Sequence, residues 1–244
     1  MLEAAFWGAV GASSLLIGAL IGLLVRLPSV VIGLVLGFGA GTLISAVSFE
    51  LTEEAYAQGG ADAVVIGLAL GALAYYLGDS AVEKHGAMQR MSSVDSKAVS
   101  ASASTALLLG AVLDGIPESA VIGLTLLEGG SVGVAVLAAV FISNLPESMS
   151  SSSGMRASGA STWHVLGTWT WVVLASAIAA GAGYGLLQNA SGNTIALIQA
   201  FAGGAVLTML ADTMMPEAFQ HGGRAVGLLT VLGFSLAYLL TLVE

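Results

Sequence analysis

Two short motifs hold the residues of this chain that are best suited to chemistry, and both read polar-x-x-Pro-Glu-Ser. One runs from Asp114 to Ser119 and the other from Ser143 to Ser148. Asp114 and Glu118 are four residues apart, so their side chains share one face of a helix. A proline inside a helix frees a backbone carbonyl of the preceding turn and bends the helix axis. The motifs therefore predict two bent helices that present several oxygen atoms.

We expect the two motifs to lie side by side in a membrane. Only the short stretch 128–130 separates their apolar segments, so the helices should be antiparallel neighbours with both motifs at similar depth. Three carboxylates in a medium of low dielectric constant repel one another, and a divalent cation or bound protons would relieve that repulsion. The alternative is that each motif only kinks its helix and holds a protonated, hydrogen-bonded glutamate. The candidate metal ligands are Asp114, Glu118, Glu147, Asn144 and Ser143.

The donor atoms of these ligands are all oxygen, which restricts the kind of metal. Oxygen ligation favours harder ions such as Mn²⁺, Mg²⁺ or Ca²⁺, whereas Zn²⁺ accepts carboxylate oxygen but more often takes nitrogen or sulfur ligands. The chain has no cysteine, which excludes disulfides and thiolate sites. Its net charge of −9 argues against nucleic acid as a partner. No pairing of a nucleophile with a base is visible, so we do not expect an enzyme.

Three further acids are candidates for an ion route: Glu50, Asp212 and Glu217. An ionisable residue inside a membrane helix costs about 2.5–3.5 kcal/mol on insertion scales, and it is a functional hypothesis by default. No Lys or Arg lies inside an apolar stretch to offset these acids. We expect Glu50 and Asp212 to be buried; the alternative is that each is an interfacial acid that reaches water. Glu217 should lie at the cytoplasmic end of its helix, as an exit residue.

The composition predicts an all-α, polytopic membrane protein with one transmembrane domain over residues 1–244. Hydrophobic residues make up 57% and charged residues 9% of the chain, whereas soluble domains carry about 25% charged residues. The segment 80–100 is polar and serine-rich, and we expect a flexible cytoplasmic loop there. Stretches of about 20 apolar residues can cross a bilayer. Eight are predicted, at about 4–25, 29–54, 61–79, 101–127, 131–153, 163–188, 193–217 and 225–243.

The basic residues set the expected orientation, because cytoplasmic loops of membrane proteins are rich in Lys and Arg. All six lie in the first, third, fifth and seventh gaps between the predicted helices, and the even gaps hold none. Both termini should therefore face away from the cytoplasm, in a protein of the plasma (inner) membrane. The six residues are Arg26, Lys84, Arg90, Lys97, Arg156 and Arg224.

Smaller features of the sequence also predict packing. The segment 37–55 matches 200–218, pairing Phe38 with Phe201 and Glu54 with Glu217. Because the two helices should run in opposite directions, this match indicates an inverted repeat of the kind found in transporters. The serine run 148–153 should allow close contact between helices. Three tryptophans near the start of the sixth helix should anchor it at the membrane interface: Trp163, Trp169 and Trp171.

With these motifs the chain resembles the ZIP (Zrt/Irt-like) family of divalent metal transporters. The resemblance rests on eight expected helices, the Pro-Glu motifs on the fourth and fifth, and the loop after the third. The segment from Asp212 to Pro216 is also similar to the family's acidic-x-x-x-Pro pattern. The resemblance implies a 3+2+3 arrangement in which helices 1–3 and 6–8 form an inverted repeat. It also implies a metal site between helices 4 and 5 and a homodimer.

The chain departs from the family pattern at several positions of the site. Asp114 stands where the family has His, and Ser143 stands where His or Gln is usual. The sixth helix of the family usually supplies a Glu, whereas here the nearest match is Ser176. The resemblance thus implies that the second of two adjacent metal sites is lost, while Asp114, Glu118 and Glu147 keep the first. The missing histidines favour harder or more varied cations and leave open a member that no longer transports.

From the residues and the resemblance together we expect a transporter that moves a divalent metal cation toward the cytoplasm. The candidate substrates are Zn²⁺, Mn²⁺, Fe²⁺ and Cd²⁺, and the expected partners are the lipid bilayer and a second copy of the chain. Helices 1, 4, 5 and 6 would move against helices 2, 3, 7 and 8, and protonation of Glu118 and Glu147 could release the ion. The alternatives are a metal-binding sensor or channel without alternating access, and a proton-linked carrier of a small cation.

Overall fold

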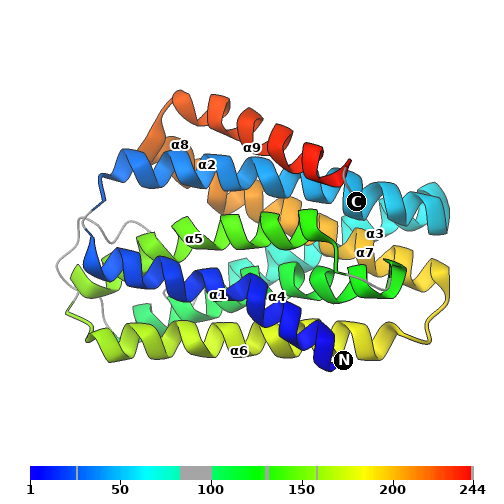
Figure 1. Ribbon diagram of the computed structural model, residues 1–244, viewed down its shortest axis with the longest axis horizontal. Helices are drawn as coiled ribbons and strands as arrows, with labels where there is room; N and C mark the ends of the chain where they lie inside the picture. Colours follow the sequence, from blue (N-terminus) through cyan, green and yellow to red (C-terminus); the bar gives the residue numbers. More distant parts are fainter. Residues whose placement is uncertain (26, 83–100, 130–131, 158, 243–244) are drawn as a thin grey trace.

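Every regular element in the described part of the chain is helical, which confirms the prediction of an all-α protein. The computed structural model describes residues 1–25, 27–82, 101–129, 132–157 and 159–242. The axes of the long helices are roughly parallel or antiparallel to one another, and the helices form one bundle (Figure 1). The elements are α1 (Leu2–Leu24), α2 (Ser29–Ala46), the π-helix η1 (Val47–Thr52), α3 (Glu53–Val82), α4 (Ala101–Gly129), α5 (Val134–Ala157), α6 (Thr162–Leu187), α7 (Gly192–Met209), the π-helix η4 (Leu210–Met214), α8 (Met215–Gly222) and α9 (Ala225–Thr241).

In the part of the chain that the structure describes, six helical stretches are long and apolar enough to cross a membrane, which is the property of an integral membrane protein. The longest is Ser29–Val82, with 54 residues. It is interrupted at Gly60, whose φ of 69° and ψ of −174° are not helical, and a glycine reaches such angles without a Cβ clash. This break falls between the predicted helices 29–54 and 61–79. The count of eight crossings and the 3+2+3 arrangement stay predictions.

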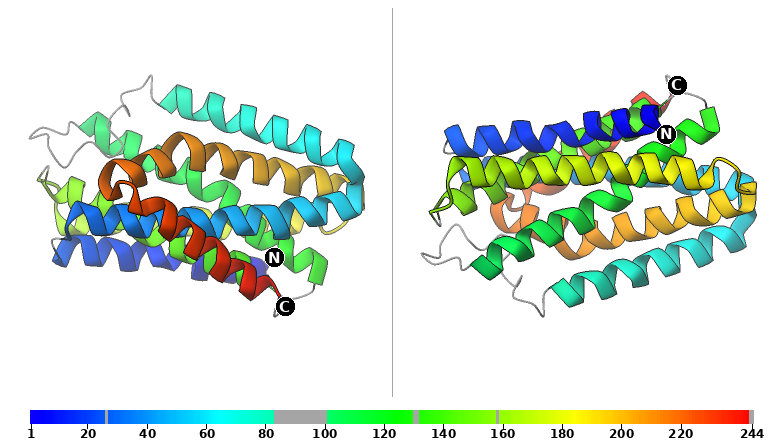
Figure 2. Two further views of the ribbon diagram at one scale, coloured as in Figure 1. Left: turned by 90° about the horizontal axis from the view of Figure 1, so that it is seen from above. Right: turned by 90° about the horizontal axis from the view of Figure 1, so that it is seen from below.

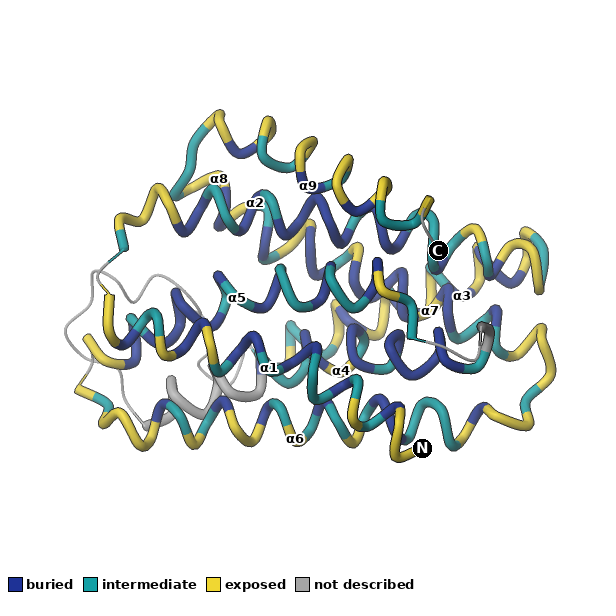
Figure 3. The backbone as a smooth tube through the Cα atoms, viewed as in Figure 1, coloured by how far each residue is buried: buried dark blue, intermediate teal, exposed yellow. Residues whose placement is uncertain are grey.

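The helices pack in two groups that meet in the middle of the bundle. In the first group, α1 lies against α5 and α6, and α4 lies against α6. In the second group, α2 lies against α8 and α9, and α3 lies against α7. Figure 2 shows α3 at an outer edge of the bundle beside α7. The groups join where α2 meets α5 and α7 meets α4. The exposed residues follow the outer sides of the helices (Figure 3), where lipid would lie.

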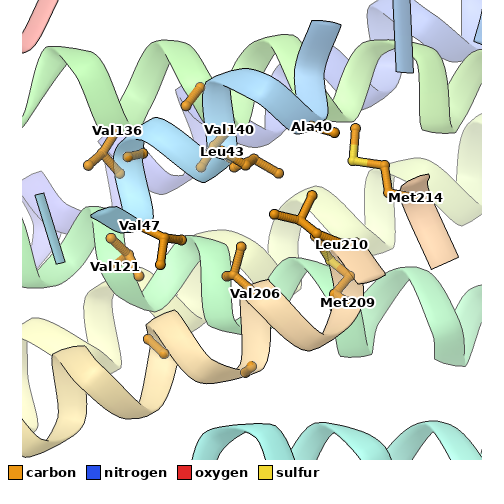
Figure 4. Close-up of a cluster of buried hydrophobic side chains, with 14 of the residues drawn as sticks. Ala40, Leu43, Val47, Val121, Val136, Val140, Val206, Met209, Leu210 and Met214 are labelled. Carbon is orange, nitrogen blue, oxygen red and sulfur yellow. The ribbon is translucent and has the colours of Figure 1, made fainter. Parts of the chain in front are cut away.

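A cluster of buried aliphatic side chains fills the space between the two groups. Leu43 of α2, Val121 of α4, Val140 of α5 and Val206 of α7 all belong to it (Figure 4). Each of these four side chains is no more than 3% exposed. Full burial of one such side chain favours the folded state by about 1.5–3 kcal/mol relative to water. In a membrane the gain is smaller, because lipid is also apolar and tight packing carries the stability.

The two matched segments of the sequence share an uncommon backbone feature. In the alignment that pairs Phe38 with Phe201, Val47 pairs with Leu210. The π-helix η1 begins at Val47, and the π-helix η4 begins at Leu210. Short π-helical turns are rare and often occur at functional sites. Their placement at equivalent positions supports the predicted inverted repeat.

Close backbone contacts at glycines follow the same repeat. Gly41 of α2 lies against the backbone of Thr230 in α9, and the paired Gly204 of α7 lies against the backbone of Leu68 in α3. A Cβ atom at either glycine would overlap the facing carbonyl oxygen, so only glycine permits this approach. In two further contacts the glycine lies on the other helix of each pair. Gly71 of α3 lies against the backbone of Phe201 in α7, and Gly233 of α9 lies against the backbone of Phe38 in α2.

One end of the bundle holds the basic residues that the structure describes. The end of α5 and the turn between α8 and α9 lie toward this end (Figure 1), and they carry Arg156 and Arg224. The Nη1 atom of Arg156 donates a hydrogen bond of 2.7 Å to the carbonyl of Leu23, which caps the last turn of α1. The other four basic residues lie outside the described residues. The predicted loop at 80–100 does too, apart from its first three residues, which continue α3.

Candidate functional site

The two Pro-Glu motifs open onto one cavity in the middle of the bundle. The cavity has a volume of about 20 Å³, enough for one water-sized ligand. α4 and α5 contribute the polar wall, and α2, α7 and η4 contribute a mostly apolar wall. The lining residues are Leu36, Asp114, Glu118, Ser143, Glu147, Met209, Thr213 and Met214. The structure thus brings four of the five predicted metal ligands to one place, while Asn144 is buried nearby, outside the lining.

The three carboxylates of the cavity differ in their surroundings. Asp114 and Glu118 are buried, with 9% and 3% of their surface exposed, and Glu147 is half-buried. The Oε2 atom of Glu118 has no hydrogen-bond partner among the described residues. A buried carboxylate oxygen without a partner loses its hydration and gains nothing in return. Glu118 is therefore the residue of the cavity that gains most from a cation or a proton.

Tyr75 of α3 supports the site, although the sequence analysis did not single it out. Its hydroxyl donates a buried hydrogen bond of 2.5 Å to Oδ1 of Asp114, a length typical of a charge-assisted bond. Tyr75 therefore fixes the orientation of Asp114. The two residues are 39 positions apart, and no spacing rule connects them.

Ser143 is arranged to accept rather than to donate at the cavity. Its hydroxyl donates to the carbonyl of Val140 over 3.0 Å. Because a hydroxyl has one hydrogen and two lone pairs, its lone pairs stay available for a positive ligand. Ser148 donates in the same way to the carbonyls of Asn144 and Leu145, over 2.9 and 3.1 Å. These bonds return hydrogen bonding to a helix that Pro146 interrupts.

The three carboxylates line the same cavity, but their side chains do not converge on one position that an ion could occupy. In the part of the chain that the structure describes, no group of three or more His, Asp or Glu side chains is placed to hold a metal ion. Metal binding by the predicted ligands thus stays a prediction, and it requires the carboxylates to move closer around the ion.

The expected ion-route residues lie in three different environments. Asp212 is exposed on the outside of the bundle, so the prediction that it is buried was wrong. It lies in η4, where a π-helical turn shifts the register and brings Thr213 and Met214 to the cavity instead. Glu50 lies in η1 and is half-buried.

Glu217 lies deeper than a residue at a helix end. It is 6% exposed, because the helix continues through α8 to Gly222, five residues past the predicted end. Its Oε1 atom accepts a hydrogen bond of 3.3 Å from the hydroxyl of Ser150. The expectation of a position at a helix terminus is therefore corrected: Glu217 is a buried acid within the bundle. Its role at the exit stays a prediction.

The serine run and the tryptophans also differ from expectation. Trp169 is 2% exposed, and its Nε1 atom donates a hydrogen bond of 2.7 Å to the hydroxyl of Ser152. It therefore packs inside the bundle, whereas Trp163 and Trp171 are exposed as interface anchors would be. The serines thus supply polar partners for side chains of neighbouring helices in addition to permitting close contact.

The position of the missing acid on the sixth helix is visible in the packing. Ser176 of α6 is 3% exposed and faces the Asp-Gly part of the first motif. A Cβ atom at Gly115 would lie 3.4 Å from the Ser176 hydroxyl oxygen. A longer acidic side chain at this position would point toward α4, so its replacement by Ser removes one carboxylate from the neighbourhood of the cavity.

Comparisons with known proteins agree with the resemblance that the motifs suggest. No family model matches the chain. The chain is 26% identical over 195 residues to a protein of Arabidopsis thaliana named "Putative zinc transporter". The match covers 78% of this chain and 30% of the plant protein, so the chain spans less than a third of that relative's length. The match supports the resemblance to the ZIP family, and the chain is distantly similar to this plant protein.

Proposed function

We propose that this protein moves a divalent metal cation across a membrane through the cavity between α4 and α5. The observation that carries the proposal is the set of three acids, Asp114, Glu118 and Glu147, around one largely buried cavity. Apart from these acids, the lining residues are apolar or carry a hydroxyl group. A divalent cation compensates the negative charge, and the unpartnered oxygen of Glu118 gains a ligand. Ser143 adds a neutral oxygen, and Asn144 would have to turn toward the cavity to contribute.

The position of the cavity also suits a transporter. α4 and α5 form its acidic wall, whereas Leu36, Met209 and Met214 of the other helix group form the opposite wall. A relative movement of the two groups would open or close the cavity, as alternating access requires. By the resemblance, α1, α4, α5 and α6 would be the moving unit. Transport toward the cytoplasm, a homodimer and outward-facing termini belong to the same proposal.

Zinc is the first metal to test, because the Arabidopsis relative is named a zinc transporter. The oxygen-only ligands of the cavity also suit Mn²⁺ and Fe²⁺, and Cd²⁺ is a useful probe. The site lacks the imidazole nitrogen that Zn²⁺ usually takes. We therefore expect a broader range of transported cations than a site with histidines would give.

Uptake into proteoliposomes tests the proposal. Glu118→Gln and Glu147→Gln remove a negative charge with little change in size, and each should reduce the initial rate of Zn²⁺ or Mn²⁺ uptake at least tenfold. Asp62→Asn is the matched control, because Asp62 is exposed and distant in sequence from the motifs. Unchanged uptake in both glutamate variants would reject this site. Saturable binding without uptake beyond one ion per protein would instead indicate a sensor.

A further inference from the structure

A second buried acid lies beyond the cavity and has a polar neighbour. Glu217 of α8 is 6% exposed, and Ser150 of α5 is 5% exposed. The Ser150 hydroxyl donates to Oε1 of Glu217, while Oε2 has no hydrogen-bond partner among the described residues. A carboxylate used only for packing would be expected to have both oxygens satisfied, since an unmet acceptor is destabilising. The Oε2 atom of Glu217 is therefore an acceptor that a ligand could satisfy.

The pair continues the same two helix faces that line the cavity. On α5, Glu147 and Ser150 are three residues apart, and on the opposite side Thr213 and Glu217 are four apart. Residues at these spacings share a helix face. With a rise of 1.5 Å per residue, the pair lies roughly 5–6 Å from the cavity along the helices. It lies on the side where α5 ends and α8 turns into α9.

The opposite side of the cavity has a different character. Glu118 also borders a smaller space, and all the other residues around it are apolar. They include Leu43, Val121, Val140 and Val206, which belong to the buried cluster in Figure 4. A cation loses its hydration without replacement in such surroundings, so an apolar constriction acts as a barrier. In this structure the polar path from the cavity therefore leads toward Ser150 and Glu217.

We propose that Glu217 and Ser150 form a second, weaker binding position for a divalent cation, one helical turn beyond the cavity. Its ligands are the Oε2 atom of Glu217 and the lone pairs of the Ser150 hydroxyl. One carboxylate binds a divalent ion less tightly than three, and a position that an ion enters and leaves must bind weakly. That ions pass through this position rests on the proposed transport function, whereas the binding itself does not.

Calorimetric titration of the full chain in detergent with Mn²⁺ tests the binding. The wild-type protein should show a tighter and a weaker class of sites. Glu217→Gln should remove the weaker class and leave the tighter one, and Glu118→Gln should do the reverse. Ser150→Ala should weaken the second class by about tenfold, as for other groups that support a metal ligand. Ser152→Ala is the matched control, because its hydroxyl accepts a hydrogen bond from Trp169 of α6 instead of facing Glu217, and it should change neither class.

Several results would overturn the inference. One is a weaker class that survives in both Glu217→Gln and Ser150→Ala. Another is loss of the tighter class in Glu217→Gln, which would place Glu217 in the first site. If Glu217→Gln does not fold, Ser150→Ala decides alone. Proteoliposome uptake separates this inference from the proposed function: a wild-type protein with two classes of sites and no uptake would contradict transport and keep the second position.

Discussion

The hydrogen bond from Tyr75 to Asp114 offers a sharp test of how the cavity binds an ion. Tyr75→Phe removes one hydroxyl and leaves the aromatic ring, which is buried in the apolar cluster. If the bond orients Asp114 for the metal, its loss should weaken metal binding. If the hydroxyl instead competes with the metal for Asp114, its loss should strengthen binding. The sign of the change therefore distinguishes the two roles.

The expected size follows from the geometry. A hydrogen bond to a charged group contributes about 1.5–3 kcal/mol, and the 2.5 Å length places this bond among the strong ones. Since every 1.4 kcal/mol is about a factor of ten in affinity, full loss of the bond corresponds to roughly 10–150-fold. Substitutions of groups that orient metal ligands typically weaken binding about 10–100-fold. We expect a rise of about tenfold or more in the dissociation constant.

Metal titration and uptake kinetics measure this effect. Tyr75→Phe should raise the dissociation constant for Mn²⁺ and the KM of uptake together. Tyr76→Phe is the matched control, because the adjacent ring is 57% exposed, and it should behave as the wild type. Asp114→Asn, alone and combined with Tyr75→Phe, completes a double-mutant cycle that measures the coupling of the pair. Tighter binding in Tyr75→Phe, or additive effects in the cycle, would refute the orienting role.

Two predictions concern stability, measured as thermal unfolding in detergent. Gly204→Ala should destabilise the protein by about 1–3 kcal/mol, as overpacking does, because its Cβ would overlap the backbone of Leu68. The control Gly227→Ala should be neutral or stabilising, because nothing lies within 4 Å of a Cβ atom at that position. Equal effects of the two substitutions would contradict the close packing at Gly204. Trp169→Phe should lower the free energy of unfolding by about 0.5–1.5 kcal/mol through the lost hydrogen bond to Ser152. The control Trp171→Phe, at an exposed position, should lower it less. A larger loss of stability in Trp171→Phe would count against the buried role of Trp169.

Local spacing was enough to predict the main part of the candidate site. The two Pro-Glu motifs lie on helices joined by a short turn, so Glu118 and Glu147 had to lie at similar depth. The match between segments 37–55 and 200–218 predicted that the two segments are equivalent, and both contain a π-helix in the structure. Nothing in the sequence marked the π-helical turns themselves. What spacing determines is the relation between residues on one helix or on two directly connected helices.

The rest depends on packing between distant segments. Tyr75 reaches Asp114 only because α3 and α4 meet in the folded bundle, and a tyrosine in an apolar stretch gives no sign of its partner. Asp212 faces outward because a π-helical turn changes the register, which a regular helical period does not include. Glu217 was expected at a helix end, and its burial follows from the continuation of that helix to Gly222.

The glycine contacts bear on where the molecule could move. Gly18 of α1 lies against the backbone of Leu145 in α5, and Gly123 of α4 lies against Ala180 in α6. Together with the contacts of Gly41 and Gly204, these approaches lie within the two helix groups, and they are too close to permit sliding. Between the groups, Gly39 of α2 approaches the backbone of Ser143 in α5, and Gly78 of α3 faces the side chain of Leu113 in α4.

Side-chain contacts can rearrange more easily than interlocked backbones, so movement should occur between the two groups rather than within them. The cavity lies at this boundary, with its acids on one group and its apolar wall on the other. The Tyr75–Asp114 bond also crosses the boundary, because α3 and α4 belong to different groups. The residue that orients one proposed ligand thus connects the group that holds the acids to the group that faces them. A shift between the groups would change this bond and the cavity together, which links ligand geometry to the state of the bundle.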